Sequence, residues 1–177
     1  MLLLAAPIFA DSFADQQRVK SGVKIFRVIL KSDQGIGDKK GKDGALTLLV
    51  VGAPDVSPQR LGELVGEMQG SGERTDIAGM PVKVEVVAAS GLDGWHGTAG
   101  GLFVAEPLPD DQLKHTVQFG MDHHVISFSP FEGDVERGVL CGLSVEAKLL
   151  PFINTRTLKA SGIAMSPVVL KVAKTHE

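Results

Sequence analysis

Two short stretches hold most of the residues that could do chemistry. The first is the loop "FSPFEGDVERGV", residues 128–139, which lies between two apolar runs and carries Glu132, Asp134, Glu136 and Arg137. In an extended loop the three alternating carboxylates would share one side, where they could exchange protons or hold Ca²⁺. A calcium loop of the EF-hand type needs a longer series of spaced oxygens ending in Glu, and this stretch has none. Arg137 could also neutralise the cluster by pairing with Glu132 or Asp134.

We therefore interpret this loop first as a structured connection and second as a docking surface, with a metal or catalytic site last. Phe131 favours docking, because an apolar ring on a charged loop is the kind of anchor that interfaces use. The predicted partner-binding residues are Phe131, Glu132, Asp134, Glu136 and Arg137.

The second stretch is "MDHH", in which Asp122 precedes His123 and His124. On a strand the two histidines would point to opposite faces, whereas Asp122 and His124 would share one with room for His96 or His115. Zinc needs three or four convergent ligands, and no spacing motif supplies them. We predict a polar beginning of a strand here and no metal site.

The remaining motifs give no sign of catalysis. The segment "SGLDGWHGTAGG" matches neither a phosphate loop nor a dinucleotide fingerprint, so Trp95 and His96 either line a ligand cleft or close one edge of the core. The sequence has no "GxSxG" elbow and no Cys–His motif. Cys141, the one cysteine, lies in the apolar run "VLCGLSV" and is expected to be buried. We predict no enzyme and no cofactor, although a hydrolase without a recognisable motif stays open.

Alternating apolar segments predict the elements that position these residues. Helical spacing marks residues 15–31, 57–70, 109–120, 155–161 and 166–173, and strand patterns mark "LTLLVVG", "PVKVEVVA", "GLFVAE", "HVISFS" and "VLCGLSVEA". Strands that alternate with helices predict an α/β fold: one layered domain with a largely parallel sheet flanked by helices. The last strands could pair antiparallel. The basic stretch "GDKKGKDG" is expected to be a mobile solvated loop.

Composition narrows the class of partner. The 177 residues suffice for one domain, 44% of them are hydrophobic, and the net charge is −3. Few aromatics (5%) and the lack of a broad basic field argue against nucleic-acid binding.

The first residues resemble an export signal. The apolar run Leu2–Phe9 is shorter than the about 20 residues that a membrane span needs, and "SFA" before Asp15 suits a cleavage site. We predict a signal peptide at 1–14, truncated because it lacks a positive start, and a mature domain at 15–177 in the periplasm that is not embedded in the membrane. The alternative is an N-terminal strand or helix packed on the core.

The C-terminal third also resembles a known family. "FSPFEGDVERGVLCGLSV" followed by "AKLLPFINTRTLKASGIAMSPVVLKVAK" is similar to the YfiR-like family of periplasmic regulatory proteins. In that family an Asn opens a helix, Ser-Gly closes it and a Leu-rich helix ends the domain. The matching positions are Asn154, Ser161, Gly162 and 170–173, and the order of elements agrees from about residue 15 to 175.

This resemblance implies a regulator that docks on the periplasmic part of a membrane signalling protein. The expected partner is a diguanylate cyclase, which the protein would repress and so control cyclic-di-GMP, or a sensor kinase. The chain lacks the paired cysteines of the family's type member, so no disulfide switch is expected. The alternative function is a periplasmic small-molecule-binding protein with a cleft at the carboxyl ends of its strands. A homodimer is left open.

Overall fold

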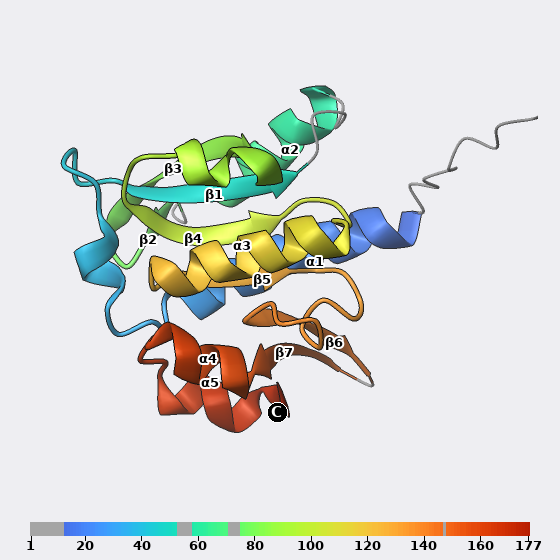
Figure 1. Cartoon of the computed structure of the whole chain (residues 1–177). Helices are drawn as coiled ribbons and strands as arrows, with labels where there is room; N and C mark the ends of the chain where they lie inside the picture. The colour runs from blue at the N-terminus through green and yellow to red at the C-terminus, as the bar shows by residue number, and fades with distance from the viewer. Residues whose placement is uncertain (1–12, 53–57, 71–74, 147) are drawn as a thin grey trace, which may run out of the picture.

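The computed structural model describes residues 13–52, 58–70, 75–146 and 148–177. The predicted signal peptide therefore lies almost wholly outside the described residues. The described chain forms one eight-stranded sheet with helices on both faces (Figure 1).

The sheet has the order β2-β3-β1-β4-β5-β6-β7-β8. β3, β1, β4, β5 and β6 run parallel, β6 and β7 pair antiparallel, and β7 and β8 run parallel. The predicted fold class, including the antiparallel pair near the C-terminus, is confirmed. The strand bounds are β1 Leu46–Gly52, β2 Asp76–Ile77, β3 Met80–Ala88, β4 Ala99–Val104, β5 Ile126–Ser129, β6 Cys141–Val145, β7 Leu149–Asn154 and β8 Lys174–His176.

Two helices cover each face of the sheet centre, which explains why β1 is a continuous apolar run. Leu48 and Val50 point into one core cluster, and Leu49 and Val51 into the other. The first cluster is closed by α1 and α2, and the second by η3 and α3, which crosses in front of the sheet in Figure 1. The helix bounds are α1 Phe13–Leu30, η1 Ile36–Lys39, α2 Pro58–Gln69, η3 Ala89–Gly94, α3 Asp110–Asp122, α4 Thr155–Ser161 and α5 Pro167–Val172.

The first cluster centres on three phenylalanine rings. Phe26 of α1 lies 5.5 Å from the rings of both Phe103 and Phe128, measured between centroids. The helix approaches this closely because β4 carries Gly101 beneath it. A Cβ at that position would lie 2.8 Å from Phe26 and from Leu30.

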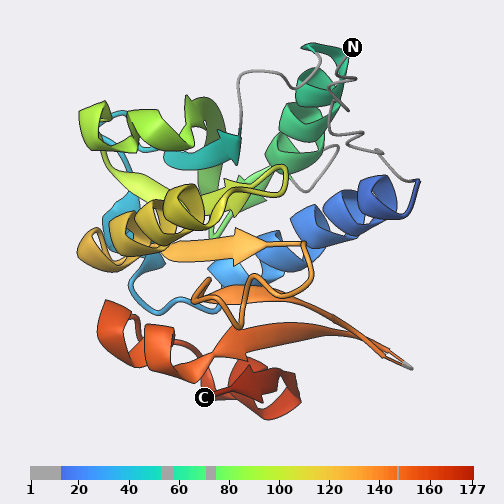
Figure 2. The same ribbon diagram turned by 45° about the vertical axis from the view of Figure 1, so that its right-hand side comes forward.

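The C-terminal elements form a separate corner, which Figure 2 shows at the lower end of the sheet. Asn154 caps α4 by accepting a hydrogen bond from the Thr157 amide, and Gly162 ends the helix in the left-handed region at φ 65°. Ser166 caps α5 and Pro167 is its first residue. These helix boundaries agree with those predicted from the sequence.

Two local predictions are wrong. Asp122 ends α3 and His123 and His124 form the turn after it, so neither histidine lies on a strand. The stretch "GDKKGKDG" is not simply a solvated loop, because Lys39 at the end of η1 is largely buried and paired with Asp33.

Candidate functional site

A hollow lies at the amino ends of the parallel strands. It has a volume of about 430 Å³ and is open to solvent on one side. We call it the amino-edge pocket. The residues that line it come from the turn after α1, from η1, from the start of β4, from the α3–β5 turn and from the segment after α4: Asp33, Gly35, Asp38, Lys39, Gly97, Thr98, Ala99, His123, His124, Gly162, Ile163 and Ala164.

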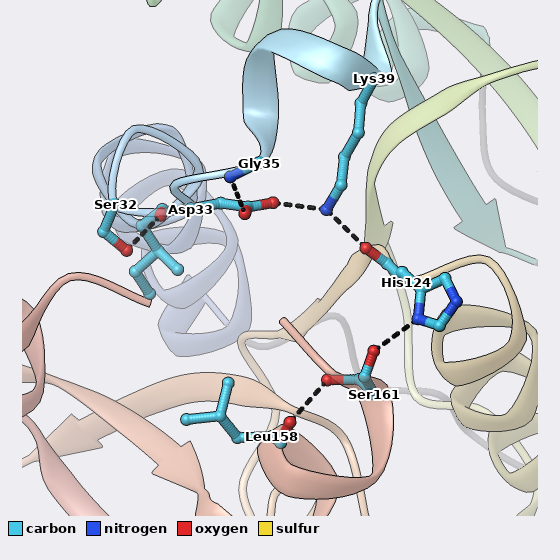
Figure 3. A network of polar contacts seen from close by, with 8 residues as sticks. Ser32, Asp33, Gly35, Lys39, His124, Leu158 and Ser161 are labelled. Carbon is cyan, nitrogen blue, oxygen red and sulfur yellow. Dashed lines mark hydrogen bonds and ion pairs between the residues drawn. The ribbon is translucent and has the colours of Figure 1, made fainter. Parts of the chain in front are cut away.

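A buried ion pair forms one wall of the amino-edge pocket (Figure 3). Asp33 is 3% exposed, and its two carboxylate oxygens accept hydrogen bonds from the Gly35 amide, at 2.9 Å, and from the Lys39 ammonium. Lys39 also donates to the backbone carbonyl of His124. Since an ammonium has three protons, Lys39 keeps one donor for a ligand.

Two histidines, His123 and His124, also line the amino-edge pocket, and both imidazoles are oriented by backbone carbonyls. His124 Nδ1 lies 2.7 Å from the Ser161 carbonyl oxygen, and His123 Nδ1 lies 2.9 Å from that of Phe119. A carbonyl only accepts, so Nδ1 carries the proton in both rings and Nε2 of the neutral ring is an acceptor. The backbone of His124 has φ 54°, a sparsely populated conformation for a residue other than glycine.

The amino-edge pocket thus combines groups of opposite character. Lys39 offers an N–H donor, the exposed Asp38 offers a carboxylate, and Thr98 adds a hydroxyl. The C-terminal ends of α1 and α3 lie nearby, and the partial negative charge at the C-terminal end of a helix favours positive charge. A small molecule that carries both an acid and an amine would satisfy these groups. Within the described residues, no group of three or more His, Cys, Asp or Glu is placed to hold a metal ion.

A smaller hollow, of about 210 Å³, lies between η3 and α3. Trp95 and His96 line it, as one interpretation of the sequence predicts. Trp95 also closes the edge of the core, because its ring lies 6.3 Å edge-on from Phe119 and its indole N–H donates to Glu85 at 2.8 Å. His115 bridges the two elements through Asp93 at 2.8 Å.

The charged loop proves to be a structured connection, its first interpretation. Asp134 is fully buried, where it accepts a hydrogen bond from the Ser129 hydroxyl at 2.5 Å and pairs with Arg137. Arg137 also reaches Asp110 at the start of α3, at 2.6 Å. The hydrogen bond to Asp134 raises the pKa of Arg137 above its usual value. The extended loop with three carboxylates on one side is therefore not observed, since Asp134 points inward.

The other residues of the predicted docking surface are more accessible. Glu132 and Glu136 are exposed, and a Glu132 carboxylate oxygen lies 3.7 Å from the Arg18 guanidinium of α1. Phe131 is half-buried against the second core cluster. Cys141 is fully buried, as expected, and burial raises the pKa of its thiol well above the usual range.

The alternative function placed a cleft at the carboxyl ends of the strands. The connections from β1 and β4 leave in opposite directions, which makes this the switch point where open α/β sheets bind ligands. Glu106, which follows β4, turns toward Gly52 at the end of β1, and its Oε1 lies 3.0 Å from where a Cβ on Gly52 would be. The amino-edge pocket thus lies at the opposite edge from the one that the alternative function predicts.

Sequence reasoning missed Asp33, Asp38, Lys39 and Thr98 as site residues. They lie between 64 and 131 positions from Gly162–Ala164 along the chain, so no spacing motif links them, and only the folded chain brings them together.

No family model matches the chain, and no curated protein matches it in sequence. Solved structures do resemble it. The ligand-free, open structure of CD0873, a substrate binding protein with adhesive properties from Clostridium difficile, has a TM-score of 0.59 at 13% identity and covers 90% of this chain and 59% of its own. The ABC domain in complex with L-Trp from Streptococcus pneumonia has a TM-score of 0.54 at 12% identity, covering 89% and 61%.

A conserved domain protein from Vibrio cholerae O1 biovar El Tor has a TM-score of 0.55 at 12% identity, covering 90% of this chain and 60% of its own. The chain therefore spans about three fifths of the length of these structures, and at such low identity the likeness shows the shared α/β fold. In the part of the chain that the structure describes, no helix is both long and apolar enough to cross a membrane.

Proposed function

We propose that this protein binds a small polar molecule that carries a carboxylate and an amine, such as an amino acid, in the amino-edge pocket. The observation that carries the proposal is that a cationic residue, Lys39, and an anionic residue, Asp38, both line one hollow of about 430 Å³. The fold supports it, because one similar structure is a substrate binding protein and another holds L-Trp. Binding is the whole activity in this proposal, with no catalytic step and no cofactor.

Each charged group of the amino-edge pocket has a stated role. The free N–H of Lys39 receives the ligand carboxylate, and its position is fixed because Asp33 and the His124 carbonyl hold the other two donors. Asp38 and the helix ends receive the ammonium. Thr98 and the Nε2 atoms of His123 and His124 bind the polar atoms of the ligand side chain.

Thermal shift assays and calorimetry with a panel of amino acids test this function. A bound ligand raises the melting temperature by mass action on the native state. Asp38→Asn should weaken binding about tenfold or more, because it removes the carboxylate and, being exposed, leaves the fold unchanged. The matched control is Glu106→Gln at the opposite edge, which should bind like the wild type. Loss of binding in the control instead would place the ligand at the carboxyl ends of the strands.

A second function, docking on a membrane signalling protein, is favoured by the accessible side of the charged loop. Asp134, Asn154 and Thr157 hold this loop in one shape, which presents Glu132, Glu136 and the edge of Phe131 outward. We propose, from the resemblance to the YfiR-like family, that an exported form of the protein docks there on the periplasmic part of a diguanylate cyclase or sensor kinase.

Cross-linking in the periplasm of the host tests this second function. Capture of one such signalling protein, lost in Glu136→Lys but retained in Lys159→Glu on α4, would support it. If the protein binds amino acids but captures no signalling protein, the docking function is contradicted and the ligand-binding function stands.

A further inference from the structure

The outer edge of β3 is a long strand edge with little cover. β3 pairs with β1 over its length from Val82 to Ala88. On its other side, β2 reaches only Met80 and Pro81. Among the described residues, no strand pairs with residues 82–88 on that side, and β3 runs along the rim of the sheet in Figure 1. Such an edge presents unpaired backbone groups to another strand.

The sequence of this edge is self-complementary in charge. Lys83 and Glu85 lie on the face of η3, and Val82, Val84 and Val86 lie on the face of α2. The Val86 side chain is 49% exposed, which is unusual for a valine in a sheet. The edge therefore carries one cation and one anion on one face and an incompletely covered apolar row on the other.

We infer that two copies of this chain pair antiparallel through β3 about a two-fold axis at Val84. In that register Lys83 of each copy faces Glu85 of the other, and Val82 faces Val86. Opposite charges and apolar pairs directly across an antiparallel ladder stabilise it. The result is a continuous sheet across the two copies with an isologous interface.

Neighbouring registers fit less well. Residues opposite each other in the ladder must lie on the same face of the sheet, so the two-fold axis must pass through a residue. The nearest alternatives to Val84 are therefore axes at Lys83 and at Glu85. A centre at Glu85 sets the two glutamates against each other. A centre at Lys83 needs Pro81, whose outer side β2 occupies. Only the register at Val84 pairs both charges favourably.

The charged residues keep capacity for this contact. Lys83 bonds Asp43 of its own chain, which leaves two of its three ammonium protons. Glu85 accepts the indole N–H of Trp95 on Oε2, and Oε1 can accept from the second copy. The same groups in their present positions can thus serve both contacts.

Sedimentation velocity on charge variants tests the dimer. The wild type should dimerise, and Lys83→Glu and Glu85→Lys should each weaken dimerisation at least tenfold by opposing like charges twice. The double swap Lys83→Glu/Glu85→Lys should restore it. Asp43→Asn, which removes only the contact within the chain, should dimerise like the wild type. A wild type that stays monomeric at 100 μM, or a dimer that neither single variant weakens, would overturn the inference.

Disulfide trapping tests the register. Under mild oxidation Val84→Cys should form a covalent dimer, because the two Cβ atoms face each other across the axis. Val86→Cys should not, because it faces Val82. The native Cys141 is fully buried and gives no background. Covalent dimer from Val86→Cys and none from Val84→Cys would contradict this register.

Discussion

At the scale of single residues, the most informative side chain is Asp134. A surface-like sequence, "EGDVER", surrounds it, yet it is fully buried. Its charge is accommodated because Ser129 and Arg137 both donate to it, and a buried carboxylate needs such partners. No periodicity marks one of three alternating acids as internal. The pairing of Arg137 with Asp134 was among the alternatives that the sequence allowed.

Replacing Arg137 should therefore cost more than its exposed position suggests. Arg137→Met leaves Asp134 buried without its charged partner, and we expect a loss of about 3 kcal/mol in the free energy of unfolding. Urea denaturation followed by circular dichroism measures it. Asp110→Asn breaks only the exposed contact of the same guanidinium and should cost about 1 kcal/mol or less. Equal losses in the two variants would show that Asp134 does not depend on Arg137.

Cys141 should be chemically silent in the native protein. Burial removes access and raises the pKa of the thiol, so almost no thiolate forms at neutral pH. A thiol reagent should label it only as fast as the protein unfolds. Glu136→Cys, placed on the charged loop, should be labelled within minutes, and labelling of Cys141 at a similar rate in the folded wild type would refute the expectation.

At the scale of elements, the sequence predicts helix boundaries best where residues within one turn of the boundary determine them. Asn154 and Gly162 mark the ends of α4, and Ser166 with Pro167 marks the start of α5, because caps act within one turn. The prediction is wrong at His123, because the end of α3 depends on a turn that packs against α4 through His124 and Ser161. The expectation of a solvated Lys39 is wrong because its partner Asp33 lies outside the basic stretch, in the turn after α1.

Asn154 should be the more sensitive of the two side-chain caps that the structure shows at α4 and α5. Its Oδ1 accepts from the Thr157 amide at 2.9 Å, and its Nδ2 donates to the Val135 carbonyl at 2.8 Å, so it joins α4 to the charged loop. We expect Asn154→Ala to lower the free energy of unfolding by about 2–3 kcal/mol, because it removes a helix cap and leaves the buried Val135 carbonyl without its hydrogen bond.

Ser166→Ala is the matched control for Asn154→Ala in the same denaturation assay. Ser166 caps the exposed helix α5, so its replacement should lower the free energy of unfolding by about 1 kcal/mol or less. A smaller loss for Asn154 than for Ser166 would mean that the contact with the charged loop contributes nothing.

At the scale of the whole molecule, the sheet class follows from apolar runs that alternate with amphipathic segments. The amino-edge pocket cannot be predicted from such a pattern, since its residues come from five separate segments that meet only after folding. The general rule for open α/β sheets directed attention to the carboxyl ends of the strands. There the structure shows Glu106 turned toward Gly52, and the amino-edge pocket is at the other end of the strands.

The most direct test of the central claim is calorimetric titration of the wild type and Asp38→Asn with the amino acid that gives the largest thermal shift. We expect saturable binding to the wild type and an affinity at least tenfold lower for Asp38→Asn, with both proteins equally folded by circular dichroism. Binding that Asp38→Asn leaves unchanged would remove the amino-edge pocket as the site. No binding of any amino acid to the wild type would contradict the proposed function itself.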